Sequence, residues 1–270
     1  MTRRLRAVLR LYRWDSSLAL AVLFLAASPL PRRAASLAGA IAWFFAAAGA
    51  YALNDATDVE IDRINHAERP VPAGELSVGA AKGAAAIAFA AAIGWGTASL
   101  HPGLLVWILP SPAVAILFCA VVRERSSLAS NVLASAGVAC IPLSAAPIRG
   151  SSGVFLVPAL TFVVMLAREL QMDLRDSPGD RIVRPSAVML GMGRQRASRL
   201  YRCILALSLV LLAVLARSRH LPAGAWAFLL IGAIPLAALM LRDPFDASDT
   251  HAQLLKLAGC GVIGVLVSST

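Results

Sequence analysis

The sequence has 270 residues, of which 59% are hydrophobic and 15% are charged, and its mean hydropathy is +0.73. A soluble chain is about half apolar and a quarter charged, so this composition excludes a soluble globular protein, a disordered protein and a coiled coil. It indicates a polytopic membrane protein. A spanning helix needs about 20 apolar residues, so nine helices would use roughly 180 residues and leave short loops. We therefore expect one membrane-embedded domain over residues 1–270.

Nine apolar runs predict an all-α bundle with nine transmembrane helices. The predicted spans are roughly 16–30, 35–53, 78–98, 103–122, 128–148, 153–170, 203–216, 222–241 and 252–269. The first and seventh runs are short for a span, so their helices would tilt or extend into flanking residues. The basic N-terminus followed by an apolar run is similar to a signal peptide. Because eight more runs follow, we expect no cleavage there.

The charge distribution predicts the orientation in the membrane. The net charge is +10, from 25 Lys and Arg against 15 Asp and Glu. In a soluble domain this excess would indicate nucleic-acid binding, but in a membrane protein it indicates topology signals and contacts to anionic membrane lipid. With nine spans, 20 of the 25 basic residues share the side of the N-terminus. The positive-inside rule then predicts a multi-pass protein of the cell inner (plasma) membrane, with a cytoplasmic N-terminus and an outside C-terminus.

Ten of the fifteen acidic residues fall in two segments on the predicted cytoplasmic side, 54–77 and 168–180. Asp55, Asp58 and Asp62 are spaced i, i+3, i+7, which on one helix would place them within an arc of about 60°. Asp173, Asp176 and Asp180 repeat that spacing after the sixth span. Pro178 and Gly179 are expected to end the helix that carries Asp173 and Asp176 before it reaches Asp180.

Three carboxylates on one helix face repel one another unless something positive lies between them. Mg²⁺ is a hard cation that takes one or two carboxylates, several waters and phosphate oxygens. Two such clusters therefore predict Mg²⁺ ions that bridge to a diphosphate. The alternative interpretation is two solvated acidic loops that share a spacing by chance. A calcium EF-hand is excluded because its Asp-x-Asp-x-Asp-Gly loop is absent.

At these two segments the chain resembles the UbiA superfamily of intramembrane prenyltransferases. Residues 54–77, NDATDVEIDRINHAERPVPAGELS, are similar to the first family signature, NDxxDxxxD followed by Arg-Pro and Pro-x-Gly. Residues 168–180, RELQMDLRDSPGD, are similar to the second signature after the sixth helix. The resemblance covers the whole chain and implies a UbiA-like helical bundle. The second segment is most like the branch that makes archaeal-type ether lipids and chlorophyll side chains.

The resemblance implies an enzyme that transfers alkyl groups other than methyl. A prenyl group would pass from a polyprenyl diphosphate donor to an unidentified acceptor, aromatic or lipid-like, at the cytoplasmic face. Mg²⁺ is the implied cofactor. The diphosphate would bind between the two aspartate clusters, and the prenyl tail would lie in an apolar groove open to lipid.

The resemblance also assigns the site residues one by one. The implied catalytic and metal-binding residues are Asp55, Asp58, Asp62, Asp173, Asp176 and Asp180. The implied substrate-binding residues are Asn54, Arg63, Arg69, Arg123, Arg125, Asn131 and Arg175. For Arg63 a topology charge is an equal alternative. Arg13 matches an Arg at the start of the family's first helix.

The chain departs from the family pattern at two places. The usual Tyr and Lys between helices four and five are absent, and Arg123 and Arg125 stand where Lys is expected. Met172 replaces a Lys that often precedes the second motif in the ether-lipid branch. These departures keep open an alternative in which the protein is a catalytically idle or repurposed relative that binds or moves a lipid-like intermediate. A third acidic segment, 242–249, is interpreted as a turn and helix cap before the last span.

Overall fold

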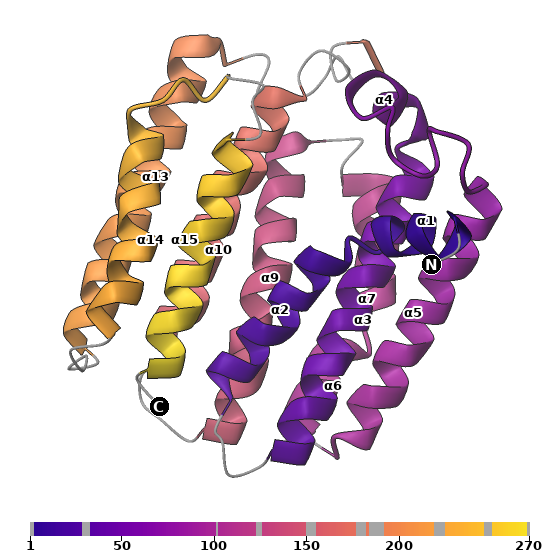
Figure 1. Cartoon of the computed structure of the whole chain (residues 1–270), viewed down its shortest axis with the longest axis horizontal. Helices are drawn as coiled ribbons and strands as arrows, with labels where there is room; N and C mark the ends of the chain where they lie inside the picture. The colour runs from indigo at the N-terminus through magenta and orange to yellow at the C-terminus, as the bar shows by residue number, and fades with distance from the viewer. Residues whose placement is uncertain are drawn as a thin grey trace. The chain divides into compact units, whose positions relative to one another are not determined.

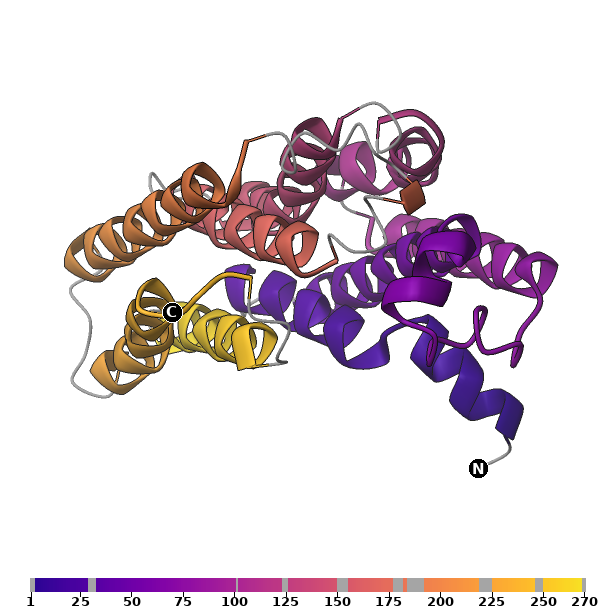
Figure 2. The same cartoon turned by 90° about the horizontal axis from the view of Figure 1, so that it is seen from above.

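The computed structural model describes residues 3–28, 33–100, 102–122, 126–149, 155–176, 182–183, 192–218, 225–245 and 250–268 (Figures 1 and 2). Its regular elements over these ranges are all helical, as the apolar runs predicted. The chain divides into two compact units, residues 1–126 with 178–185 and residues 127–177 with 186–270. The single domain expected over residues 1–270 stays a prediction.

Unit 1 is built around the long helix α3, which packs against α2 on one side and α5 on another (Figure 1). Its elements are α1 (Arg3–Leu11), α2 (Trp14–Ala27), α3 (Arg33–Thr57), α4 (Val59–Asn65), α5 (Val78–Ala98), α6 (Pro102–Ile108), α7 (Ser111–Leu117) and the π-helical turn η2 (Phe118–Val122). Small residues allow α3 and α5 to approach closely. A Cβ added at Gly49 of α3 would lie 3.0 Å from the Phe89 ring of α5.

A buried apolar cluster lies where α1, α3, α5 and the 66–77 connection meet. It consists of Leu11, Ala52, Ala56, Val71, Ala81, Ala85 and Phe89. Val71 anchors the connection that follows α4, and Leu11 anchors the end of α1, which lies crosswise to α3 and α5 in Figure 1. The Tyr12 hydroxyl also donates a hydrogen bond to the Ala84 carbonyl at 2.9 Å. These contacts hold the two segments that flank the first aspartate motif.

The predicted span 103–122 is interrupted in the structure. Helix α6 ends at Ile108, and α7 starts at Ser111 after a turn at residues 109–110. Pro110 and Pro112 explain the break, because proline lacks an N–H donor and fits only the first turn of a helix. The whole stretch Pro102–Val122 remains long and apolar enough to cross a membrane.

Unit 2 contains α9 (Ser127–Arg149), α10 (Leu156–Arg175), α13 (Arg194–Ser218), α14 (Ala225–Met240) and α15 (Thr250–Ser268). Helix α10 packs on α9 and α13, α13 packs on α14, and α14 packs closely on α15. Figure 1 shows the C-terminal end of α10 and the N-terminal end of α13 at the same end of this unit. The arrangement places Asp173 and Asp176 of the second aspartate motif and the arginine-rich start of α13 at that shared end.

Five helical stretches of the described residues are long and apolar enough to span a membrane: 34–57, 78–98, 102–122, 127–145 and 194–218. Three more apolar helices, at 14–27, 225–240 and 253–265, are shorter. The chain is thus a multi-pass membrane protein, while the number nine stays a prediction. The seventh run, predicted at 203–216, extends in α13 to Arg194, so its basic flank is helical.

The contact between α14 and α15 depends on glycine. A Cβ added at Gly261 would overlap the backbone of Gly232. In a membrane the hydrophobic effect does not drive helices together, so van der Waals contacts at such close approaches stabilise their association. We expect Gly261→Ala to lower the free energy of unfolding by about 1–3 kcal/mol or more, because overpacking forces the two backbones apart. Thermal unfolding of the purified protein in detergent measures this.

Gly259→Ala is the matched control, since the same helix leaves open space around that position. Its effect should stay within about 0.5 kcal/mol, as for substitutions that touch nothing. Equal midpoints for both variants would contradict the close α14–α15 contact.

Candidate active site

The first aspartate motif lies at the end of α3 and on the short helix α4. The two helices are separated at Asp58, so the prediction of one continuous helix is wrong at that residue. The helical hydrogen bonds nevertheless continue through the junction. The backbone N–H of Asp58 donates to the Asn54 carbonyl at 2.9 Å, and the backbone N–H of Asp62 donates to the Asp58 carbonyl at 2.8 Å. Asp55 therefore comes from α3, Asp58 from the junction and Asp62 from α4.

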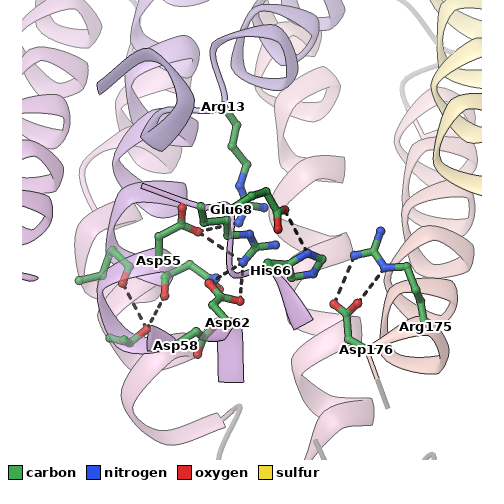
Figure 3. A network of polar contacts seen from close by, with 12 residues as sticks. Arg13, Asp55, Asp58, Asp62, His66, Glu68, Arg175 and Asp176 are labelled. Atoms are coloured by element: carbon green, nitrogen blue, oxygen red, sulfur yellow. Dashed lines mark hydrogen bonds and ion pairs between the residues drawn. The ribbon is translucent and has the colours of Figure 1, made fainter. Parts of the chain in front are cut away.

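All three carboxylates of this motif are buried, with side chains that belong to residues only 1–2% exposed. Two arginines from outside the motif contact them (Figure 3). Arg13 donates to Asp55 at 2.7 Å, and Arg69 lies 2.7 Å from both oxygens of Asp62 and 3.6 Å from Asp55. Asp58 accepts a hydrogen bond from the Asn54 amide at 2.9 Å. The fold thus supplies positive charge where the three carboxylates would otherwise repel one another.

Arg13 is held in an unusual backbone conformation between α1 and α2. Its φ of 42° and ψ of 56° lie in the left-handed region, which costs a non-glycine residue roughly 1–2 kcal/mol. Its guanidinium lies 4.7 Å from the centre of the Tyr51 ring while it donates to Asp55. The strained turn is compensated by these two contacts, which aim the side chain at the motif.

Arg69 is positioned by a compact turn that α1 fastens from outside. Arg10 of α1 binds the Glu75 carboxylate at 3.1–3.2 Å and also donates to the Glu68 carbonyl. Gly74, at a φ of +72°, allows the chain to turn back, and the N–H of Glu75 donates to the Pro70 carbonyl at 2.9 Å. With Val71 in the apolar cluster, these bonds hold the turn that carries Arg69 beside Asp62 and Asp55.

Burial dominates the electrostatics of Asp62. It raises the pKa of the Asp62 carboxyl above its usual value, and the nearby Arg69 guanidinium only partly reverses that rise. For Arg13, burial lowers the pKa, but Asp55, Tyr51 and Asp62 together more than offset this, and the net shift of the pKa is upward. The folded chain therefore binds a proton at Asp62 more tightly than the unfolded chain does. The contribution of this group to stability falls as the pH rises through its raised pKa.

Asp173 and Asp176 of the second aspartate motif lie at the C-terminal end of α10 in unit 2. The Asn131 amide of α9 donates a hydrogen bond to the Asp173 carboxylate at 2.7 Å, so this asparagine lies against the motif. Arg175 donates to both oxygens of Asp176, at 2.7 and 3.3 Å (Figure 3). Helix α10 ends at Arg175, yet the Asp176 N–H still donates to Met172 at 2.8 Å. These carboxylates are less buried than those of the first motif.

The remaining predicted site residues divide into three groups. Asn54 and Arg69 contact first-motif aspartates, as described above. Arg63 is exposed and has no ion pair with any of the described residues, which favours the topology alternative. Asp180, Arg123 and Arg125 lie outside the described residues.

Two features of the site had no clear signal in the sequence. The clamp from Arg10 to Glu75 joins residues 65 positions apart, so no local pattern predicts it. Gln171 is 1% exposed, and neither atom of its amide has a hydrogen-bond partner within the described part of the chain. Glutamine is usually exposed to solvent, and one near the end of an apolar helix would be predicted to be so. The burial of Gln171 was therefore not predictable from the sequence.

The donor chemistry of the first motif fits Mg²⁺. No group of three potential ligands within metal-binding reach occurs among the described residues. Mg²⁺ does not require one, because it takes one or two carboxylates and completes its shell with water and phosphate oxygens. Three buried carboxylates outnumber the two guanidiniums that contact Asp55 and Asp62. Those two arginines alone therefore do not neutralise the motif, and its oxygen donors suit a hard cation.

Arg13→Gln tests the charge balance of the first motif. Among the described residues it would leave Asp55 with the more distant Arg69 as its one cationic partner. Because an unpaired buried charge is costly, we expect a loss of about 2 kcal/mol and a fall in the unfolding midpoint of roughly 4–8 °C. Thermal unfolding in detergent measures it.

The double variant Arg13→Gln with Asp55→Asn should recover most of that stability, because an asparagine needs no counter-charge. Arg6→Gln, an exposed arginine of α1, is the matched control and should leave the midpoint unchanged. A midpoint for Arg13→Gln equal to that of Arg6→Gln would show that Arg13 does not compensate Asp55.

The chain is similar to known proteins over most of its length. Residues 16–258 match the UbiA prenyltransferase family. The digeranylgeranylglyceryl phosphate synthase of Methanoculleus marisnigri is 35% identical over 136 residues, a match that spans about half of the chain (49%) and half of that relative (48%). The synthase of the same name from Thermococcus kodakarensis is 28% identical over 90% of this chain and 89% of its own.

A solved structure supports the same fold. The UbiA homologue of Archaeoglobus fulgidus, determined with GPP and Mg²⁺ bound, aligns with a TM-score of 0.73 at 14% identity. The alignment covers 98% of this chain and 100% of the other. With the sequence match over residues 16–258, the two aspartate motifs and the helical fold, this chain belongs to the UbiA prenyltransferase family.

Proposed function

We propose that this protein is a Mg²⁺-dependent prenyltransferase that moves a prenyl group from a polyprenyl diphosphate to an acceptor at the cytoplasmic membrane face. The observation that carries the proposal is the buried cluster of Asp55, Asp58 and Asp62 with Arg13 and Arg69 against it. Such a cluster offers oxygen ligands for a divalent cation and guanidiniums for phosphate oxygens. The structure of a UbiA homologue with GPP and Mg²⁺ supports this assignment.

The residues would divide the work by chemistry. Asp55, Asp58 and Asp62 would hold Mg²⁺ on the side of the first motif, and Asp173, Asp176 and Asp180 on the side of the second. When bound, Mg²⁺ would neutralise the diphosphate and act as a Lewis acid toward it. Arg69 and Arg175 are the arginines we place on the diphosphate, where their fork geometry suits phosphate oxygens.

The reaction would break the bond between C1 of the prenyl group and the diphosphate oxygen. The electron pair leaves with the diphosphate, C1 becomes cation-like, and an electron-rich atom of the acceptor forms the new bond and gives up its proton. Neutralising charge on the departing diphosphate lowers the barrier, because the interaction is strongest as that charge develops. Because Asp55, Asp58 and Asp62 are buried, bulk solvent screens their charges little, which strengthens their interaction with a cation.

For the acceptor we propose a lipid-like molecule. The name digeranylgeranylglyceryl phosphate synthase, shared by two of the relatives above, supports a glyceryl phosphate acceptor. Met172 stands where the ether-lipid branch often has a lysine, and a methionine cannot donate to a phosphate on the acceptor. A phosphate on the acceptor would then need other positive groups of this chain.

Asp58→Asn and Asp176→Asn test the proposed chemistry. Each variant removes one carboxylate charge at nearly constant shape, so it should abolish Mg²⁺-dependent prenyl transfer, a fall of roughly 100-fold or more. The first measurement is binding of prenyl diphosphates of ten to fifty carbons to the purified protein, with and without Mg²⁺. Turnover is then measured with the chain length that binds.

Glu60→Gln is the matched control, because Glu60 belongs to the same helix as Asp62 but is exposed. It should keep wild-type binding and turnover. Wild-type turnover of both aspartate variants would overturn the metal assignment. Failure of the folded wild-type protein to bind any prenyl diphosphate would instead favour the alternative of an idle relative that handles a lipid-like intermediate.

The charge asymmetry of the loops supports a cytoplasmic position for both motifs and the N-terminus, and an outside C-terminus. Arg63 offers a reporter because it is exposed and adjacent to Asp62. A cysteine introduced by Arg63→Cys should react with a membrane-impermeant thiol reagent only after the cytoplasmic side is opened. Labelling in intact cells, at the level of a known outside cysteine, would reverse the proposed topology.

A further inference from the structure

An open groove of about 390 Å³ lies in unit 2 beside the first turns of α13. It is lined by Arg194, Gln195, Ser198, Arg199, Arg202 and Asp243. At 100° per residue the five residues from α13 share an arc of about 140° on one helix face. The buried Ala197 and Tyr201 lie outside that arc. One wall of the groove is therefore a continuous polar stripe with three guanidiniums.

The opposite wall engages one of these arginines. Arg194 pairs with Asp243 and lies 4.6 Å from the centre of the Phe245 ring. Asp243 also accepts a hydrogen bond from the Phe245 N–H at 3.1 Å, which closes the turn after α14. The predicted turn is seen at residues 243–245, and the predicted helix cap at residues 246–249 lies outside the described residues. The acidic charge of the groove is thus paired with Arg194.

Arg199 and Arg202 are different. Both are exposed, both line the groove, and neither forms an ion pair or hydrogen bond with any residue that the structure describes. They lie at i and i+3 on the helix, where side chains are neighbours. Ser198 and Gln195 add a hydroxyl and an amide donor between and beside them. The groove therefore carries two unneutralised guanidiniums with neutral donors around them.

This set of donors suits a phosphate group. Guanidinium forks bind phosphate oxygens bidentately, and two of them match the charge and the several acceptor oxygens of one phosphate. Helix α13 is one of the stretches long and apolar enough to span the membrane, and the groove lies at its end. The end of a spanning helix lies at the depth of lipid headgroups, where anionic phosphates are concentrated.

We propose that the groove at the start of α13 is a binding site for a phosphate group at the membrane surface, with Arg199 and Arg202 as its main ligands. The phosphate can belong to the headgroup of an anionic phospholipid or to a soluble phosphate. The site is distinct from the aspartate motifs, because none of its residues belongs to either motif. Topology alone requires basic residues on one side of the membrane but not at these two positions, and the proposed site explains their positions.

The test compares two double variants of the full chain, purified in detergent. Arg199→Gln with Arg202→Gln removes both proposed ligands. Arg196→Gln with Arg217→Gln is the control, because it removes two exposed arginines of the same helix that do not line the groove. Native mass spectrometry measures binding of dioleoyl phosphatidylglycerol and, as a neutral comparison, dioleoyl phosphatidylcholine. Calorimetry measures binding of inorganic phosphate.

We expect the groove variant to bind phosphatidylglycerol about tenfold more weakly than wild type, because it loses two charge-assisted contacts. The control variant and the binding of phosphatidylcholine should not change. A loss confined to inorganic phosphate would support the site and assign it to soluble phosphates. Equal affinities of the two double variants for both anions would overturn the proposal. The single variant Arg199→Gln repeats the comparison with less perturbation of the chain.

Discussion

The burial of three carboxylates at the end of a membrane helix is the constraint on which the rest of this structure depends. Asp55, Asp58 and Asp62 lie within eight residues of sequence and are nearly inaccessible to solvent. Their mutual repulsion and their desolvation both oppose folding. The raised pKa of Asp62 shows that burial outweighs the guanidinium beside it. A purely structural helix end gains nothing from such a cluster, whereas a site that binds a divalent cation requires it.

The compensating charges come from elements that are remote in sequence. Arg13 precedes α2, so the whole of α2 and most of α3 separate it from Asp55 along the chain. Arg69 follows α4 in the next turn. The scaffold of unit 1 serves to place them: the apolar cluster fixes Leu11 and Val71, and the clamp from Arg10 to Glu75 fastens α1 to the turn. The left-handed conformation of Arg13 is the local cost of that placement. Stability of the bundle and charge balance of the site are therefore supplied by the same contacts.

The sequence predicted the helical class and the aspartate pattern because both depend on local signals, apolar run length and residue spacing. Asn131, which the resemblance assigned to substrate binding, contacts Asp173, and its role stays a prediction. The interruption at Asp58 was not predictable, because Asp58 carries no proline or glycine signal and helical hydrogen bonds continue through it. For the seventh run the sequence left tilt and extension into flanking residues open. Helix α13 does extend to Arg194, because the four arginines that end the apolar run are good helix formers.

The two aspartate motifs share a spacing but not an electrostatic setting. In the first motif, remote guanidiniums contact nearly inaccessible carboxylates. In the second, Asp176 pairs with its own neighbour Arg175 and Asp173 with the neutral amide of Asn131, and both remain partly exposed. Solvent screens partly exposed charges, so the ion pair between Arg175 and Asp176 is worth less free energy than the ion pairs of the buried first motif. The first motif is thus the one whose carboxylates the fold holds most firmly.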